Sequence, residues 1–178
     1  MVSNIEKPGV PMLAIVAYSG TGKTTLLKKV IPILTRQGIR IGLIKHTHHQ
    51  MDIDTPGKDS YELRKAGALQ TMVAGNQRWA LMTETPHQQE PDLHWLASRM
   101  DTSRLDLILV EGFKHEAVAK LLLYRAAAGR PFSGLPDDDH TLAIVSDEPC
   151  PCGLPWLDIC DGPQVAAFIA AWLRRQTP

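Results

Sequence analysis

Residues 17–24 read Ala-Tyr-Ser-Gly-Thr-Gly-Lys-Thr, and this stretch is the strongest indication of the fold. It follows the phosphate-loop pattern G-x-x-x-x-G-K-[ST], with Ala17 in place of the first glycine. An apolar run at residues 12–18 precedes the motif, and apolar side chains recur at helical spacing over residues 23–37. A strand, this loop and a helix, in that order, are typical of proteins that bind nucleotide phosphates.

Each residue type in the loop has a physical role in holding phosphate. Gly20 and Gly22 allow the backbone to curl, so that successive N–H groups point into one concavity. The positive end of the following helix faces the same concavity. Lys23 adds a full charge, and the Thr24 hydroxyl is a candidate ligand for Mg²⁺. The candidate phosphate site comprises Ser19, Gly20, Thr21, Gly22, Lys23, Thr24 and Thr25.

Ala17 adds only one methyl group where the motif has glycine. We expect it to be tolerated if its φ angle is negative, because side chains are strained at positive φ.

A metal-linked acid is expected beside the loop. Glu111 ends the apolar run 107–110, which is typical of a strand buried on both faces. Open α/β sheets bind ligands at the carboxyl ends of their strands. Glu111 is therefore the candidate to hold Mg²⁺ or to polarise a water, and a solvated acid at a strand end is the alternative. Asp106 begins the same strand and belongs to the opposite edge.

The rest of the chain alternates between strand and helix patterns. This alternation predicts an α/β fold, a mostly parallel sheet flanked by helices with P-loop NTPase architecture. Gly75 and Asn76 predict a hairpin that adds an antiparallel element at one edge. No linker divides residues 1–178, so we expect a single domain. Further strands are predicted at residues 39–45, 69–74, 78–83, 105–110, 119–124 and 141–146, and further helices near Asp59, at residues 91–100 and from Pro163.

Two helices carry local signals. Pro32 lies inside the pattern of the first helix and predicts a kink or a shortened helix. Asp59 with Glu62 three residues later resembles a capping box, so Asp59 is expected to cap its helix. A switch-like role of Asp59 near Mg²⁺ is a second hypothesis.

The charge balance, the apolar runs and the cysteines of the sequence argue against several classes of protein. Nineteen Lys and Arg balance nineteen Asp and Glu, which argues against a dedicated nucleic-acid binder and against a polybasic membrane anchor. No apolar run approaches the roughly 20 residues of a membrane helix, and no signal peptide is expected. The three cysteines are no disulfide framework, so a reducing cytoplasm fits best.

Two further clusters have more than one interpretation. Residues 45–49, Lys-His-Thr-His-His, could bind a transition metal, contact a phosphate or cofactor ring, or form a solvated loop. Cys150, Cys152 and Cys160 could form a metal or redox cluster, but small core or loop thiols are favoured.

Selection of the base is weakly encoded. The guanine-reading pattern N-K-x-D is absent from the sequence. Asp147 follows the strand at residues 141–146, and its carboxylate could accept two hydrogen bonds from guanine. The alternative is an acid that begins a turn at the end of a strand.

Five segments of the chain are more specific than the phosphate loop alone: SGTGKTTLLKK at 19–29, GLIKHTHH at 42–49, DIDTPGKDSYELRKAGA at 52–68, RWALMTET at 78–85 and LDLILVEGFKHE at 105–116. Together they resemble the MobB family, the molybdopterin-guanine dinucleotide biosynthesis adaptors. The resemblance implies a cytoplasmic, homodimeric GTP-binding protein with slow GTP hydrolysis at most. It also implies partnership with MobA, the guanylyltransferase of the pathway, and a role in forming or delivering the guanylated molybdenum cofactor. Lys45, His46 and Asp59 lie in the signature segments, and Glu111 corresponds to the metal-linked acid.

Two other functions remain open from the sequence. A small-molecule kinase would need arginines on a lid, and Arg125 and Arg130 flank the loop at residues 125–140. A metallochaperone GTPase would use His46, His48 and His49. Direct binding of molybdopterin is a further possibility that the sequence leaves open.

Overall fold

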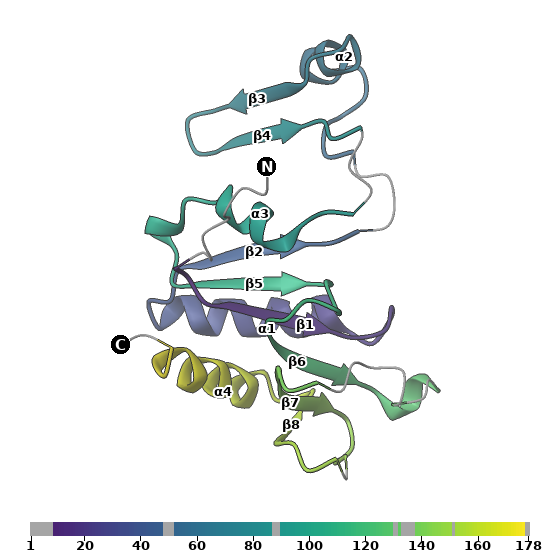
Figure 1. The fold of residues 1–178 in the computed structure, drawn as a ribbon, viewed down its shortest axis with the longest axis vertical. Coiled ribbons are helices and arrows are strands. Elements are labelled where there is room, and N and C mark those ends of the chain that lie inside the picture. Colours follow the sequence, from purple (N-terminus) through teal and green to yellow (C-terminus); the bar gives the residue numbers. More distant parts are fainter. Residues whose placement is uncertain are drawn as a thin grey trace. The chain divides into compact units, whose positions relative to one another are not determined.

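The computed structural model describes residues 9–47, 52–86, 90–129, 132, 138–150 and 152–176 (Figure 1). The contacts divide the chain into two compact units, Thr47–Pro91 and the rest. Each unit has its own β-sheet. The expectation of a single domain over residues 1–178 stays a prediction.

The larger unit is built on a six-stranded sheet with the strand order β2-β5-β1-β6-β7-β8. Every neighbouring pair is parallel, which confirms the predicted mostly parallel sheet. β1 therefore lies between β5 and β6, although about 90 residues of the chain separate it from β5 and about 100 separate it from β6. The strands are β1 (Met12–Val16), β2 (Ile41–Lys45), β5 (Leu107–Glu111), β6 (Ala119–Tyr124), β7 (Thr141–Ser146) and β8 (Trp156–Asp158).

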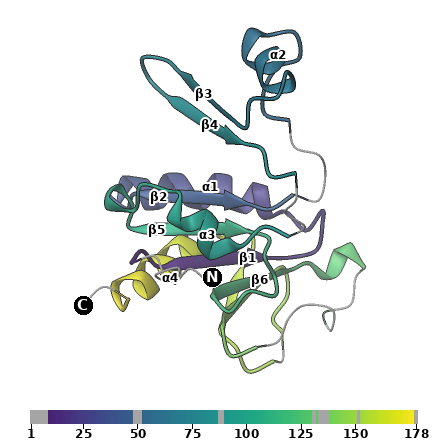
Figure 2. The same cartoon turned by 45° about the horizontal axis from the view of Figure 1, so that its top comes forward.

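Helices cover both faces of this sheet (Figure 2). Successive strand residues point to opposite faces, so Leu13 and Ile15 pack with α1 and α4 while Ala14 and Val16 pack on the side of α3. All four side chains are almost completely buried. The two apolar layers fix the sheet between them, and thereby the edge at which the phosphate loop begins. The helices are α1 (Lys23–Arg36), α3 (Leu93–Ser98) and α4 (Gly162–Arg174), with 3₁₀ turns η1 (Thr102–Arg104) and η2 (Ala126–Ala128).

The ends of α1 and α4 follow from local chemistry. α1 continues through Pro32 and ends at Arg36, one residue before the predicted end. The proline therefore shortens the helix by one residue at most. Pro32 is on the exposed side, where a carbonyl that loses its helical partner can bond to water. α4 begins one residue before the predicted Pro163, and the Asp161 carboxylate caps it by accepting from Gln164 N at 2.8 Å.

The smaller unit contains α2 (Asp59–Lys65), β3 (Gln70–Ala74) and β4 (Trp79–Thr83). β3 and β4 pair antiparallel, which confirms the predicted hairpin, and Gly75 N donates to Arg78 O at 2.9 Å to close its turn. Within the described ranges the hairpin forms a two-stranded sheet of its own and is not hydrogen-bonded to the parallel sheet.

The predicted cap of α2 is wrong. Lys58 occupies the N-cap position with extended backbone and no side-chain cap, and Asp59 is the first helical residue. The turn before the helix accounts for this shift, since Lys58 N donates to Thr55 O within it. The helix therefore begins one residue before the position that an Asp59 cap would require. Asp59 still favours the helix, because a carboxylate in the first turn interacts with the positive end of the dipole.

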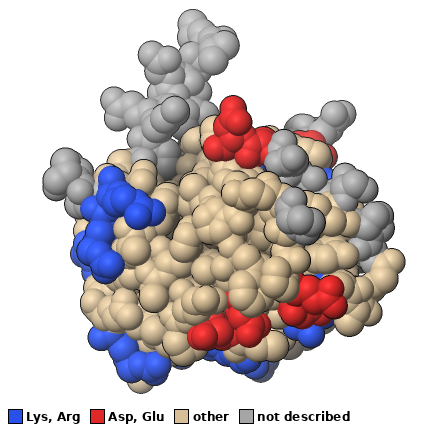
Figure 3. Space-filling view, turned by 90° about the horizontal axis from the view of Figure 1, so that it is seen from below, with Lys and Arg blue, Asp and Glu red and all other residues tan. Residues whose placement is uncertain are grey.

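One face of the molecule has a broad area without charged side chains. On this face, which Figure 3 shows, the Lys, Arg, Asp and Glu side chains lie around that area, and blue groups adjoin red ones at its lower edge. Among the helices of the described ranges, none combines the length and apolar character needed to cross a membrane.

Candidate functional site

The phosphate loop joins the carboxyl end of β1 to the first turn of α1. Gly20 and Gly22 have φ angles of 82° and 107°, in the left-handed region that glycine enters without strain. Gly22 is the N-cap of α1, and its carbonyl accepts from Leu26 N at 2.9 Å. The two glycines thus curl the backbone as the sequence predicts.

The first position of the motif tolerates its alanine. Of the described residues other than glycine, Phe113 alone has a positive φ, so Ala17 satisfies the condition set by its methyl group.

The hydroxyl groups of the loop divide into two kinds. Thr21 is buried, and its Oγ1 donates to Tyr18 O at 3.0 Å, which holds the loop closed from within. Ser19, Thr24 and Thr25 are exposed, so their hydroxyls are accessible to a ligand. The structure therefore gives Thr21 a structural role through its side chain.

Lys23 folds back over the loop. Its Nζ donates to Ala17 O and to Tyr18 O, both at 3.2 Å. Burial lowers the pKa of Lys23, the nearby Glu111 carboxylate acts in the opposite direction, and the positive charge of Lys45 lowers it further. The ammonium is thus partly desolvated and held by neutral carbonyls, which an anionic ligand can replace with stronger charge-assisted bonds.

The sheet brings Glu111 to the loop. Glu111 is the last residue of β5 and the register partner of Ile15 on β1, two residues before Ala17. It is also the register partner of Lys45 on β2, and Nζ of Lys45 lies 3.5 Å from its Oε2. Lys23, Lys45 and Glu111 therefore share one edge of the sheet.

The backbone after Glu111 turns sharply. Gly112 has φ 102° and Phe113 has φ 53°, which is rare for a bulky side chain. His46 fits against this turn: its N donates to Glu111 O at 2.8 Å, and its ring centroid lies 4.9 Å from that of Phe113. A Cβ on Gly112 would lie 2.8 Å from that of His46, so only glycine fits there. The sequence reasoning missed Gly112 and Phe113, although a glycine directly after the acid is a signal of such a turn.

Asp147 lies one residue after β7 and has a structural contact. Its Oδ1 accepts from Ala126 N at 2.9 Å and so ties the end of β7 to the turn η2 that follows β6. A carboxylate has about four lone-pair positions, so this bond leaves acceptor capacity for a ligand.

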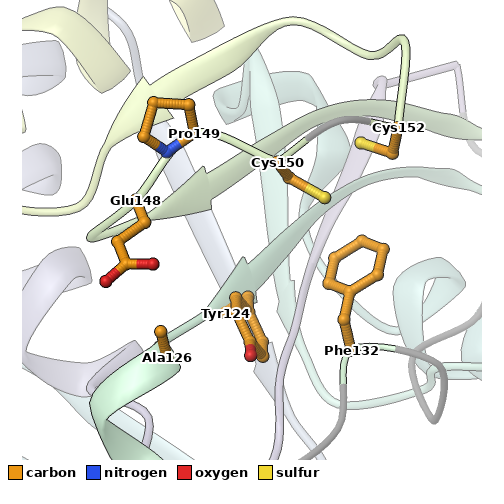
Figure 4. Close-up of a pocket in the computed structure, with 7 residues that line it drawn as sticks. All are labelled: Tyr124, Ala126, Phe132, Glu148, Pro149, Cys150 and Cys152. Atoms are coloured by element: carbon orange, nitrogen blue, oxygen red, sulfur yellow. The ribbon is translucent and has the colours of Figure 1, made fainter.

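A pocket of about 410 Å³ opens at the carboxyl ends of β6 and β7 (Figure 4). Tyr124 and Phe132 meet edge to face in it, with ring centroids 5.4 Å apart. Burial raises the pKa of the Cys150 thiol, and a hydrogen bond with Cys152 acts in the same direction. The neutral form of the Cys150 thiol is thus favoured over the reactive thiolate. The lining residues are Tyr124, Ala126, Phe132, Glu148, Pro149, Cys150 and Cys152.

Further predicted residues belong to the smaller unit or lie outside the described residues. Asp59 belongs to the smaller unit. His48, His49 and Arg130 lie outside the described residues. In the part of the chain that the structure describes, no three His, Cys, Asp or Glu side chains gather as a metal site would require, and all three cysteines are free.

The parallel sheet, the glycine-rich loop at the end of its inner strand β1 and the acid at the end of the adjacent strand define the architecture of a P-loop NTPase. The model of the family described as MobB, molybdopterin guanine dinucleotide synthesis protein B, matches residues 12–147. The chain therefore belongs to the MobB family, and this membership assigns it to molybdopterin guanine dinucleotide biosynthesis.

Individual relatives agree with the family. The chain is 61% identical over 170 residues to a molybdopterin-guanine dinucleotide biosynthesis adapter protein of Escherichia coli, covering 96% of this chain and 97% of the relative. It is 46% identical to a protein of the same description from Haemophilus influenzae, over 92% of this chain and 90% of that one. A crystal structure of a MobB homologue from Bacillus stearothermophilus superimposes with a TM-score of 0.71 at 26% identity, covering 92% of this chain and 98% of the homologue.

Proposed function

We propose that the chain is a GTP-binding adapter that assists the synthesis or delivery of the guanylated molybdenum cofactor, with weak GTP hydrolysis at most. The observation that carries the proposal is the meeting of Lys23, Glu111 and the phosphate loop at one edge of the sheet in a member of this family. The description of the E. coli and H. influenzae relatives as adapter proteins supports the same role.

The triphosphate occupies the phosphate loop in this proposal. Backbone N–H groups of residues 20–25 and the start of α1 surround the phosphates, and Lys23 exchanges its two carbonyl partners for phosphate oxygens. The exposed hydroxyls of Ser19, Thr24 and Thr25 complete the contacts.

Mg²⁺ is proposed to be held by the Thr24 hydroxyl and the Glu111 carboxylate. Both are oxygen ligands, the kind that this hard cation takes in sites shared with phosphate. Lys45 already balances the Glu111 charge, which fits an acid that exchanges an internal partner for a cation. When bound, the metal would neutralise charge on the phosphates, and Glu111 would orient a water for slow hydrolysis.

Four further residues are given roles toward the nucleotide. Asp147 is proposed to accept hydrogen bonds from guanine, using the acceptor positions that the bond from Ala126 leaves. Lys45 and His46 are proposed to contact the phosphate side, next to Glu111. For Asp59 a role near the metal rests on the family segment alone.

The proposed partners are MobA, molybdopterin and a second copy of the chain in the cytoplasm. The surface of the smaller unit supports a protein partner, because several large apolar side chains on α2 and the hairpin are exposed. A two-stranded hairpin is marginally stable alone, so a second copy that covers it would stabilise it. The exposed side chains are Leu63, Leu69, Met72, Val73, Trp79 and Leu81.

Calorimetric titration of the purified protein with GTP, GDP and ATP, each with Mg²⁺, tests the nucleotide part. We expect guanine nucleotides to bind more tightly than ATP. Equal or tighter binding of ATP, with phosphorylation of a pterin or nucleoside, would instead support a small-molecule kinase. The adapter part is tested by gel filtration with purified MobA, where the GTP-loaded protein should elute with the enzyme.

A further inference from the structure

Arg125 approaches the phosphate loop from the strand on the far side of β1. It directly follows β6, the neighbour of β1 opposite to β5. A Cβ placed on Gly22 would lie 3.7 Å from Nη2 of Arg125. The guanidinium thus lies close to Gly22, the residue that precedes Lys23 and is the N-cap of α1.

The backbone around Arg125 is held from both sides. Tyr124 is the last residue of β6 and the register partner of Ser146 on β7. After Arg125, Ala126 N donates to Asp147 Oδ1, and Ala128 N donates to Arg125 O at 3.0 Å in the turn η2. The root of the side chain is therefore fixed while its guanidinium reaches the loop.

The charge of Arg125 has no described acid as its partner. Ion pairs within the described ranges neutralise Arg40, Arg64 and Lys120, whereas none joins Arg125 to a carboxylate. The side chain is half-buried. A cation in such a position is stabilised by an anion that arrives with a ligand.

The order of the strands sets a direction along the loop. Glu111 and Lys45 lie on the β5 and β2 side of β1, where the proposed function puts Mg²⁺ and the γ-phosphate. Arg125 lies on the β6 side, next to Ala126 and Asp147, which the proposed function assigns to the base. Figure 4 shows Tyr124 and Ala126, the two chain neighbours of Arg125, among the residues that line the pocket.

We propose that Arg125 is a second cation of the phosphate site, supplied by the same chain, that binds the diphosphate part of the nucleotide from the β6 side. Its planar guanidinium can make two parallel hydrogen bonds to phosphate oxygens, which Lys23 cannot. The inference rests on the proposed function, which already sets the direction of the nucleotide, and it adds a residue that holds the diphosphate between the β5 side and the base.

The test is calorimetric titration of Arg125→Ala and Arg125→Lys with GDP and GTP. For Arg125→Ala we expect both affinities to fall by the same factor, at least about tenfold, since the two nucleotides share the diphosphate. Arg125→Lys should recover part of the loss, and the salt dependence of binding should decrease for the alanine variant. Arg36→Ala is the matched control, because it removes an exposed arginine at the opposite end of α1.

Three outcomes overturn the inference. Unchanged GDP and GTP affinities exclude any contact with phosphate, and a loss confined to GTP assigns Arg125 to the γ-phosphate. An equal loss in Arg36→Ala attributes the effect to net charge. Wild-type protein that binds no guanine nucleotide contradicts the proposed function itself, so the two failures are distinguishable. Thermal melts without nucleotide verify that each variant is folded.

Discussion

Lys45 and Glu111 end neighbouring parallel strands as register partners, and Nζ of the lysine lies 3.5 Å from Oε2 of the acid. The Glu111 side chain is 11% exposed and that of Lys45 is 56% exposed. The sheet therefore fixes the carboxylate, while the ammonium can move away into solvent. Because the carboxylate is nearly buried, it needs a positive partner, and a bound cation could take the place of the exposed Lys45 ammonium.

Glu111→Gln is expected to reduce the effect of Mg²⁺ on GTP affinity by about tenfold or more and to reduce phosphate release. The amide keeps the shape of the side chain but loses the charge that holds the metal. Titrations with and without Mg²⁺ and a phosphate-release assay measure the two effects. Asp106→Asn, at the other end of the same strand, should leave both unchanged. Normal hydrolysis in Glu111→Gln would contradict the assignment.

Lys23→Ala is expected to weaken GTP binding by at least tenfold, or ~1.4 kcal/mol. The substitution removes the only full charge within residues 17–25, and Ala17 O and Tyr18 O lose their shared donor. The affinity for GTP is measured by calorimetry. Lys28→Ala, an exposed lysine further along α1, is the control and should bind normally. Wild-type affinity in Lys23→Ala would sink the phosphate-loop assignment.

The parts of the fold that sequence patterns encode locally were predictable. The apolar runs of β1, β5, β6 and β7 are long enough to be recognised, and the glycines of the phosphate loop give its backbone conformation. β8 was missed because a strand of three residues has no measurable alternation. The cap of α2 was misplaced because the turn Thr55–Lys58, not the nearest acid, determines where the helix begins.

The pairing of distant residues could not be predicted. No local pattern states that β5 lies between β1 and β2, and without that order Lys45 and Glu111 are only two polar strand ends. The same holds for Arg125, which reaches Gly22 because β6 lies beside β1. Strand order depends on the packing of α1, α3 and α4 against both faces, a property of the whole unit.

Gly112→Ala is expected to destabilise the protein by roughly 2–4 kcal/mol, because it combines strain at positive φ with a clash against His46. Urea unfolding measures the change. Gly129→Ala is the matched control, since that glycine also has positive φ, but its Cβ would meet no atom of the described residues within 4 Å. It should cost only the strain, roughly 1 kcal/mol. Equal losses in the two variants would show that His46 moves aside freely.

Asp106 gives a prediction for the pH dependence of stability. Hydrogen bonds from the side chain and backbone of Arg40 lower the pKa of Asp106 to about 2, from an ordinary value of 3.8. A carboxyl whose pKa falls on folding stabilises the native state above its unfolded pKa, and this stabilisation is lost as the pH falls toward the folded value. Asp106→Asn should therefore lower the urea midpoint at pH 7, and the difference from wild type should shrink below about pH 4. A difference that is constant from pH 7 to pH 3 would contradict this.

The proposed dimer depends on one face of the hairpin. Trp79 and Leu81 are two residues apart on β4, so their side chains point to the same side of the hairpin. Leu81 is the register partner of Met72 on β3, which points to that side as well. These three side chains are 66%, 45% and 61% exposed, respectively. Val73 pairs with Ala80 and points to the opposite side, with 44% of its surface exposed.

The double substitution Trp79→Ser and Leu81→Ser is expected to convert a dimer to a monomer, because burial of large apolar side chains is the main driving force of such interfaces. Sedimentation equilibrium over a range of concentrations measures the dissociation constant, which should rise by at least about a hundredfold. Val73→Ser removes a similar apolar group from the other face and should leave the dimer intact. Equal dissociation in both variants would point to loss of the hairpin rather than of a contact face, and a monomeric wild type would exclude the second copy as the occupant. Circular dichroism of each variant distinguishes a lost contact from a lost hairpin, since only the latter reduces the strand signal.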